Sequence, residues 1–221
     1  MFKGTKEAVM TTQEVAKPAT SSAFLATGAM FCMVYSAIAL LALHVLRPDY
    51  APESNFISNY GVGPFGWVMT TWFLAQAVGT LLFAIGVARS GLRSITARIA
   101  ISLMVIEVVG LVFSATFPTD LPGAPPTRAG HIHTISFLVN VASFLAVTLL
   151  LPISFGSHPG WRSFRPTAWA LTGLIIVAFA IQFATLHKGM PYGLANRFFV
   201  IVALAWGLAT AARLRAVLLS R

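Results

Sequence analysis

One segment of the sequence concentrates side chains that could do chemistry. Residues 117–137, FPTDLPGAPPTRAGHIHTISF, carry an acid, an arginine and two histidines between two long apolar runs. These are Asp120, Arg128, His131 and His133. The prolines and the glycine between positions 122 and 126 rule out a continuous helix, because proline lacks a backbone donor and clashes with the preceding turn. We therefore predict a loop in water that leads into a membrane helix near Gly130.

A polar stripe continues into that predicted helix. His133, Ser136, Asn140 and Ser143 recur three or four residues apart, so they lie on one helical face. Lipid cannot satisfy the hydrogen bonds of such a face, which must therefore point at protein or at water. We expect the other helices to pack around this stripe.

The composition is that of an integral membrane protein. Hydrophobic residues make up 57% of the 221 positions, charged residues make up 10%, and the mean hydropathy is +0.80. A soluble domain carries about 25% charged residues. The one cysteine, Cys32, lies in the first apolar run, so no internal disulfide forms and a packed thiol is expected.

Six apolar runs reach the ~20 residues that a helix needs to cross a bilayer. They cover residues 23–46, 67–88, 95–117, 131–155, 167–186 and 194–212. The first run is too long for the core of a signal peptide, so a retained helix is favoured. We predict an all-α bundle of six transmembrane helices over residues 23–221, preceded by a cytoplasmic tail over residues 1–22.

The distribution of lysine and arginine predicts the orientation. Most of them lie in the tail, after the second and fourth runs, and after the sixth. The positive-inside rule then places both termini in the cytoplasm, and we expect a multi-pass protein of the cell membrane. The net charge of +9 is explained by this topology, so membrane lipids and not nucleic acids are the expected partners. Homo- or hetero-oligomers in the membrane are left open.

Several motifs resemble the DUF998 family of bacterial and archaeal membrane proteins. They are residues 58–90, FPTD at 117–120, GHIH at 130–133 and GLANR at 193–197. The resemblance covers nearly the whole chain after the tail and implies six membrane helices without an established activity. The family is in turn distantly similar to the Frag/DRAM/Sfk-type proteins, which is a likeness of fold only.

The matching positions include five that we predict to bind a ligand in a polar pocket at the outer face. These are Ser58, Tyr60, Asp120, His133 and Arg197. The structural alternative is that they tie the outer loops together, with an ion pair between Asp120 and Arg197 and with His133 capping a helix.

Glu107 lies in the middle of the third run. An ionised carboxylate there costs about 2.5 to 3.5 kcal/mol on insertion scales, so it must face inward or be protonated. Gly110 and Ser114 share its face and lead toward Asp120, which suits a path for protons or ions. The alternative is a buried acid that is hydrogen-bonded to Gln76, Asn140 or Gln182.

Histidines at the outer side raise the question of a cofactor. Asp120, His131, His133 and His187 are suitable zinc ligands by type. On a helix, however, the side chains of His131 and His133 point about 200° apart. Both can bind one zinc ion only if the backbone between them is not helical. A bis-histidine haem b would be held best by His44 and His133. We predict no cofactor, with zinc and haem as alternatives.

Three classes of function follow from these residues. The leading prediction is a protein that binds or handles a lipid or a small polar ligand. The first alternative is a lipid hydrolase or transferase using Asp120 and His133, with or without a metal and with Ser54 or Ser58 as nucleophile, although no nucleophile-elbow motif surrounds either serine. The second is a non-catalytic subunit of a membrane assembly.

Overall fold

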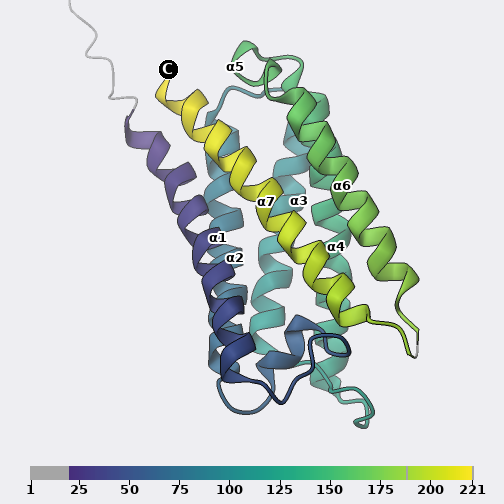
Figure 1. Cartoon of the computed structure of the whole chain (residues 1–221). Helices are drawn as coiled ribbons and strands as arrows, with labels where there is room; N and C mark the ends of the chain where they lie inside the picture. Colours follow the sequence, from purple (N-terminus) through teal and green to yellow (C-terminus); the bar gives the residue numbers. More distant parts are fainter. Residues whose placement is uncertain (1–19, 188, 221) are drawn as a thin grey trace, which may run out of the picture.

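A computed structural model describes residues 20–187 and 189–220, and these residues form an all-helical bundle (Figure 1). Six helices are long and apolar enough to cross a membrane. They are α1 (Thr20–Leu46), α2 (Gly66–Arg89), α3 (Ile95–Thr116), α4 (Arg128–Phe155), α6 (Arg165–Ala184) and α7 (Tyr192–Leu219). The connections hold a 3-10 helix, η1 (Ile57–Gly61), and the single turn α5 (Pro159–Arg162). The predicted six-helix fold is confirmed, and the chain is a multi-pass membrane protein.

The largest difference from the predicted spans is at the end of α7. This helix continues to Leu219, past the predicted end at residue 212. Arginine is a good helix former, and the guanidinium of Arg213 donates to the carbonyl of Gly160 and, over 2.8 Å, to Oγ of Ser163. The last turns of α7 are thus held against the connection around α5. The predicted tail lies mostly outside the described residues, and α1 already begins within it, at Thr20.

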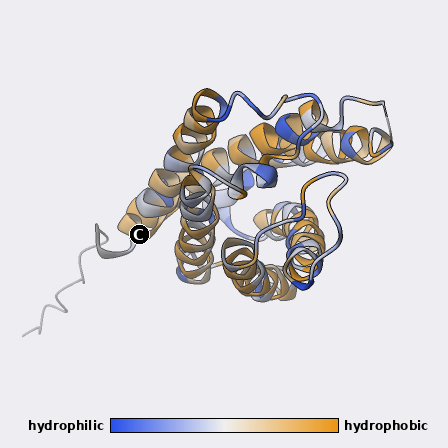
Figure 2. Cartoon of the chain, turned by 90° about the horizontal axis from the view of Figure 1, so that it is seen from below, coloured by the Kyte–Doolittle hydropathy of each residue, from blue (hydrophilic) through white to orange (hydrophobic). Residues whose placement is uncertain are grey.

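Apolar side chains cover the outside of the helices. Phe31, Val45 and Phe183 are 72%, 80% and 70% exposed, and Figure 2 shows the helices largely in the colour of hydrophobic residues. A water-soluble monomer rarely exposes apolar surface on this scale. The exposed faces therefore match the lipid that would surround six membrane-spanning helices.

The helices pack in chain order, and α7 closes the bundle. Helix α1 contacts α2 and α7, α3 lies between α2 and α4, and α6 contacts both α4 and α7. In Figure 1, α7 crosses in front of the other helices. The approach of α1 to α2 is close, because a Cβ added to Gly79 would lie 3.0 Å from Cβ of Cys32. The cysteine is thus packed between two helices, as a small apolar residue would be.

Pro152 lies inside α4 and leaves a carbonyl for the neighbouring helix. Proline has no N–H, so the carbonyl of Thr148, four residues earlier, receives no helical hydrogen bond from it. The hydroxyl of Thr172 in α6 donates to that carbonyl over 2.7 Å. Both threonines are buried. The proline in α4 therefore provides a specific link to α6.

The connections divide between two ends of the bundle. Residues 47–65, 117–127 and 185–191 join the helices at what we call the loop end, at the bottom of Figure 1. The other end, which we call the terminal end, carries both termini of the described chain and α5. All the ligand-binding residues predicted from the sequence lie toward the loop end. Its placement on the outer side of the membrane stays a prediction from the basic residues.

Candidate functional site

A buried arginine shapes the long connection between α1 and α2. Arg47 is 5% exposed and pairs with Asp49, with 2.8 Å between guanidinium and carboxylate. The other terminal nitrogen of Arg47, Nη1, donates to the carbonyls of Val62 (2.7 Å) and Pro64 (2.8 Å). The guanidinium also lies 4.3 Å from the ring centre of Tyr50. Hydrogen bonds from Arg47 hold the pKa of the exposed Asp49 below its usual range. Sequence reasoning missed this role of Arg47.

Arg197 joins α7 to the same connection and to the end of α1. Its Nε–H donates to Nε2 of His44 over 2.7 Å, and one terminal nitrogen donates to the hydroxyl of Tyr60 over 3.0 Å. The other terminal nitrogen donates to the carbonyls of Pro52 (2.9 Å) and Asn55 (2.7 Å). The side chain is only 8% exposed. With its donors already used inside the protein, Arg197 ties three segments of the loop end together.

Two neighbours of Arg197 strengthen that tie. A Cβ on Gly193 would lie 2.2 Å from the carbonyl oxygen of Pro52 and 2.6 Å from that of Asn55, so only glycine admits this close approach. Oδ1 of Asn196 accepts a hydrogen bond from the backbone N–H of Ile57 over 3.0 Å, at the start of η1. The GLANR segment is thus the docking surface for residues 52–60.

Asp120 stabilises the start of α4 and does not contact Arg197. Its carboxylate accepts from the backbone N–H of Thr127 (2.9 Å) and from the Thr127 hydroxyl (2.7 Å). The carboxylate also covers Gly130, where a Cβ would come within 2.0 Å of it. These two hydrogen bonds, with a smaller electrostatic contribution from His131, lower the pKa of Asp120. The ion pair with Arg197 that the structural alternative required is not formed.

His133 begins a chain of polar contacts between α3 and α4. Its Nδ1–H donates to the carbonyl of Phe117 over 2.8 Å, which closes the end of α3. One turn further, the hydroxyls of Ser136 and Ser114 are 2.8 Å apart, and Nδ2 of Asn140 lies 3.4 Å from the same Ser114 oxygen. The polar stripe of α4 therefore faces α3, inside the protein.

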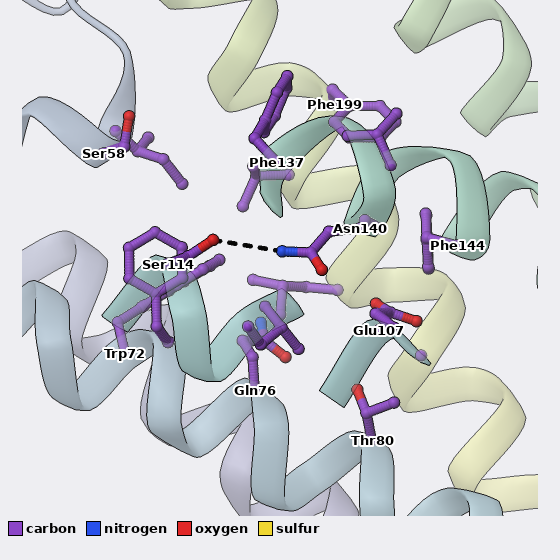
Figure 3. A pocket seen from close by; sticks show the side chains of 18 of the residues that line it. Ser58, Trp72, Gln76, Thr80, Glu107, Ser114, Phe137, Asn140, Phe144 and Phe199 are labelled. Atoms are coloured by element: carbon purple, nitrogen blue, oxygen red, sulfur yellow. Dashed lines mark hydrogen bonds between the residues drawn. The ribbon is translucent and has the colours of Figure 1, made fainter. Parts of the chain in front are cut away.

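A cavity of about 410 Å³ lies beside this stripe. Residues of α2, α3, α4 and α7, with part of η1, line it, and Figure 3 shows their side chains converging on one space. Most of the lining is apolar or aromatic, including Phe73, Phe137, Phe144 and Phe199. A volume of 300–1,000 Å³ with few polar groups is typical of a small-molecule site.

The cavity separates the predicted site residues into two groups. Ser58 and His133 line it near the loop end, and Glu107 and Asn140 line it deeper in the bundle. The remaining three do not line it. They are Tyr60, Asp120 and Arg197, which instead hold the surrounding connections.

The family assignment rests on a match over most of the chain. The model of a family described as "Protein of unknown function (DUF998)" matches residues 30–213. The chain belongs to the DUF998 family. The expected resemblance is confirmed, while no curated protein and no solved structure matches the chain.

The motifs that carry the likeness to DUF998 mark structural ties in this member. Gly193 and Arg197 of GLANR hold residues 52–60, and Tyr60 of the first motif accepts from Arg197. Phe117 of FPTD accepts from His133 of GHIH. The same two motifs place the carboxylate of Asp120 against Gly130, as described above. Of the motif residues that make these contacts, only His133 lines the cavity, so the other contacts hold the connections around its loop end.

In this DUF998 protein the residues proposed for metal, haem or hydrolase chemistry do not form one arrangement. Residues 130–133 are helical, and no group of three or more His, Cys, Asp or Glu within 20–187 and 189–220 is placed to hold a metal ion. The haem pairing of His44 with His133 is likewise disfavoured, because Nδ1 of His44 bonds to the carbonyl of Leu40 while Nε2 accepts from Arg197. Asp120 bonds to Thr127 and does not orient His133.

The sequence analysis named Gln76 only as an alternative partner of Glu107, and it missed Thr80 and Trp206 in the deep lining. Gln76 and Thr80 are four residues apart on α2 and both line the cavity with Glu107 (Figure 3). Two polar residues at that spacing on an apolar helix are a signal that could have been found. Trp206 of α7 also lines the cavity and gave no signal, because only the packing of α7 across the bundle brings it there.

Proposed function

We propose that this DUF998 protein binds a lipid or another small amphipathic molecule in the cavity between α2, α3, α4 and α7. The observation that carries the proposal is the cavity itself, which has a volume of about 410 Å³ and is lined mainly by apolar and aromatic side chains. Such a lining favours a hydrocarbon or aromatic body, and the few polar groups would orient it. Ser58 and His133 are the predicted ligand-binding residues that line this space.

The proposal extends to the location of the protein. Six candidate membrane spans and an excess of basic residues at the terminal end support a bacterial inner-membrane protein with both termini in the cytoplasm. The loop end would then face outward, and the cavity would take its ligand from the outer leaflet. Tyr60, Asp120 and Arg197 would serve binding indirectly, by holding the connections that wall the cavity.

Filling the cavity tests the proposal. Ala203 lines the cavity from α7, whereas Ala205 on the same helix is exposed and does not line it. Native mass spectrometry of the detergent-purified protein should show a copurified small molecule that Ala203→Phe removes and Ala205→Phe retains. The proposal is wrong if the wild type carries no bound molecule and gains none from added lipid extract. Equal retention of the molecule by both variants would also contradict it.

A further inference from the structure

The deep part of the cavity holds a carboxylic acid without a counter-charge. Glu107 and His133 are the only ionisable residues among those that line the cavity, and the lining includes no lysine or arginine. Glu107 lies nine residues before the end of α3, which is about 14 Å along the helix axis from the loop end. Solvent at the helix ends is therefore distant from this acid.

No described side chain satisfies Glu107. Within residues 20–187 and 189–220, none donates a hydrogen bond to its carboxylate, and the one ion pair there is Arg47 with Asp49 at the loop end. Gln76, Thr80 and Asn140 lie around it in Figure 3, but the amide of Asn140 donates to Ser114 instead. Polar groups inside a membrane protein are costly unless paired, so an acid without a partner on a cavity wall is a candidate for binding a ligand.

Aromatic rings surround the same space. Trp206 contacts Phe83 at 6.4 Å and Phe144 at 5.8 Å between ring centres, and all three line the cavity. Trp72 lines it as well. The Nε1 atoms of Trp72 and Trp206 have no hydrogen-bond partner among the described residues. The faces of such rings attract ammonium groups, and the attraction is strongest where water is excluded.

We propose that the ligand is an apolar amine and that Glu107 holds its ammonium group. The inference rests on the proposed function, because it names the ligand class of that same cavity. A carboxylate without a protein cation, set among aromatic rings, suits a protonated amine at the end of an apolar body. The body fills the space between Glu107 and the loop end, where Phe73, Phe137 and Phe199 line the wall. Ser58 and His133 lie at its far end.

Three probes with one hydrocarbon chain isolate the role of the amine. Dodecylamine, dodecanol and dodecanoic acid differ only in the terminal group. Each is titrated into the detergent-purified full chain, and the fraction of one-to-one adduct is followed by native mass spectrometry. We expect dodecylamine to bind on the order of tenfold or more tighter than dodecanol, as loss of a charge-assisted contact implies, and dodecanoic acid to bind weakest. Equal binding of the amine and the alcohol would overturn the inference.

Two matched substitutions locate the contact. Glu107→Gln keeps the size of the side chain and removes its charge, so it should abolish the preference for the amine over dodecanol. Glu53→Gln removes an exposed acid that does not line the cavity and should keep the preference. Retention of the preference in Glu107→Gln would contradict the inference. If Glu107→Gln does not fold, the ratio of dodecylamine to dodecanol affinity of the wild type still tests the inference.

The Ala203→Phe variant separates this inference from the function on which it rests. Probes that bind the wild type and are lost in Ala203→Phe confirm the cavity, whichever head group they carry. Binding of that kind without a preference for the amine overturns only the assignment of Glu107. If no probe shows binding that Ala203→Phe removes, both proposals are overturned.

Discussion

The Nε–H of Arg197 donates to Nε2 of His44 over 2.7 Å, while Nδ1 of the same histidine bonds to the carbonyl of Leu40. A carbonyl only accepts, so His44 is neutral with its proton on Nδ1. The first and last helices of the bundle are thereby joined at the loop end, next to the cavity.

Arg197 should be among the least replaceable residues of the chain. Arg197→Met would leave the carbonyls of Pro52 and Asn55, and the ring of His44, without their donor, so we expect a loss of roughly 3 kcal/mol or more in the free energy of unfolding. Arg128→Met is the control, because Arg128 is exposed. Unfolding in denaturing detergent measures both variants, and equal stabilities would refute the role given to Arg197.

Two glycines should respond oppositely to the same substitution. Gly193→Ala would drive a methyl group to 2.2 Å from the Pro52 carbonyl oxygen, and because backbone must move, we expect the loop end to loosen and the melting temperature to fall. A Cβ on Gly173 in α6 meets nothing within 4 Å, so Gly173→Ala should be neutral or stabilise by up to about 1 kcal/mol through helix propensity. A thermal melt of each variant is sufficient. Similar shifts of the melting temperature in both variants would show that the close contact at Gly193 does not determine stability.

The link between α6 and α4 can be tested by a double-mutant cycle. Thr172→Val removes the donor to the Thr148 carbonyl and should cost about 1 kcal/mol. Pro152→Ala restores a backbone N–H that can donate to the same carbonyl, so Thr172→Val should cost less in that background. Additive effects of the two substitutions would mean that the proline and the threonine act independently.

Asp120 should give the loop end a dependence on pH. Hydrogen bonds from Thr127 lower its pKa in the folded protein. A carboxyl group of this kind stabilises the fold fully above its unfolded pKa of about 3.9, and that contribution is lost as the pH falls through the lower, folded value. The stability difference between wild type and Asp120→Asn should therefore be constant near neutral pH and vanish in acid. A difference that grows as the pH falls would contradict this sign.

The ties at the loop end show why side-chain contacts were harder to predict than the helices. As its structural alternative, the sequence analysis paired Asp120 with Arg197, because opposite charges at one end of a bundle attract. The structure gives Asp120 a nearer donor in Thr127, and it gives Arg197 backbone carbonyls of Pro52 and Asn55. Carbonyl acceptors are present at every residue, so no pattern in the sequence indicates which of them an arginine will meet.

The sequence by itself determined the six membrane spans, their approximate ends and the inward face of α4, because hydrophobic length and the spacing of polar residues are local properties. The DUF998 motifs were equally visible. Only the tertiary structure decided that α7 crosses the bundle, so that Trp206 and Glu107 line one cavity. It also decided that Ser58 and His133 border this cavity, while Tyr60, Asp120 and Arg197 hold the connections around it. A cavity is the space left between several packed helices, so its lining depends on their relative placement and not on any one segment.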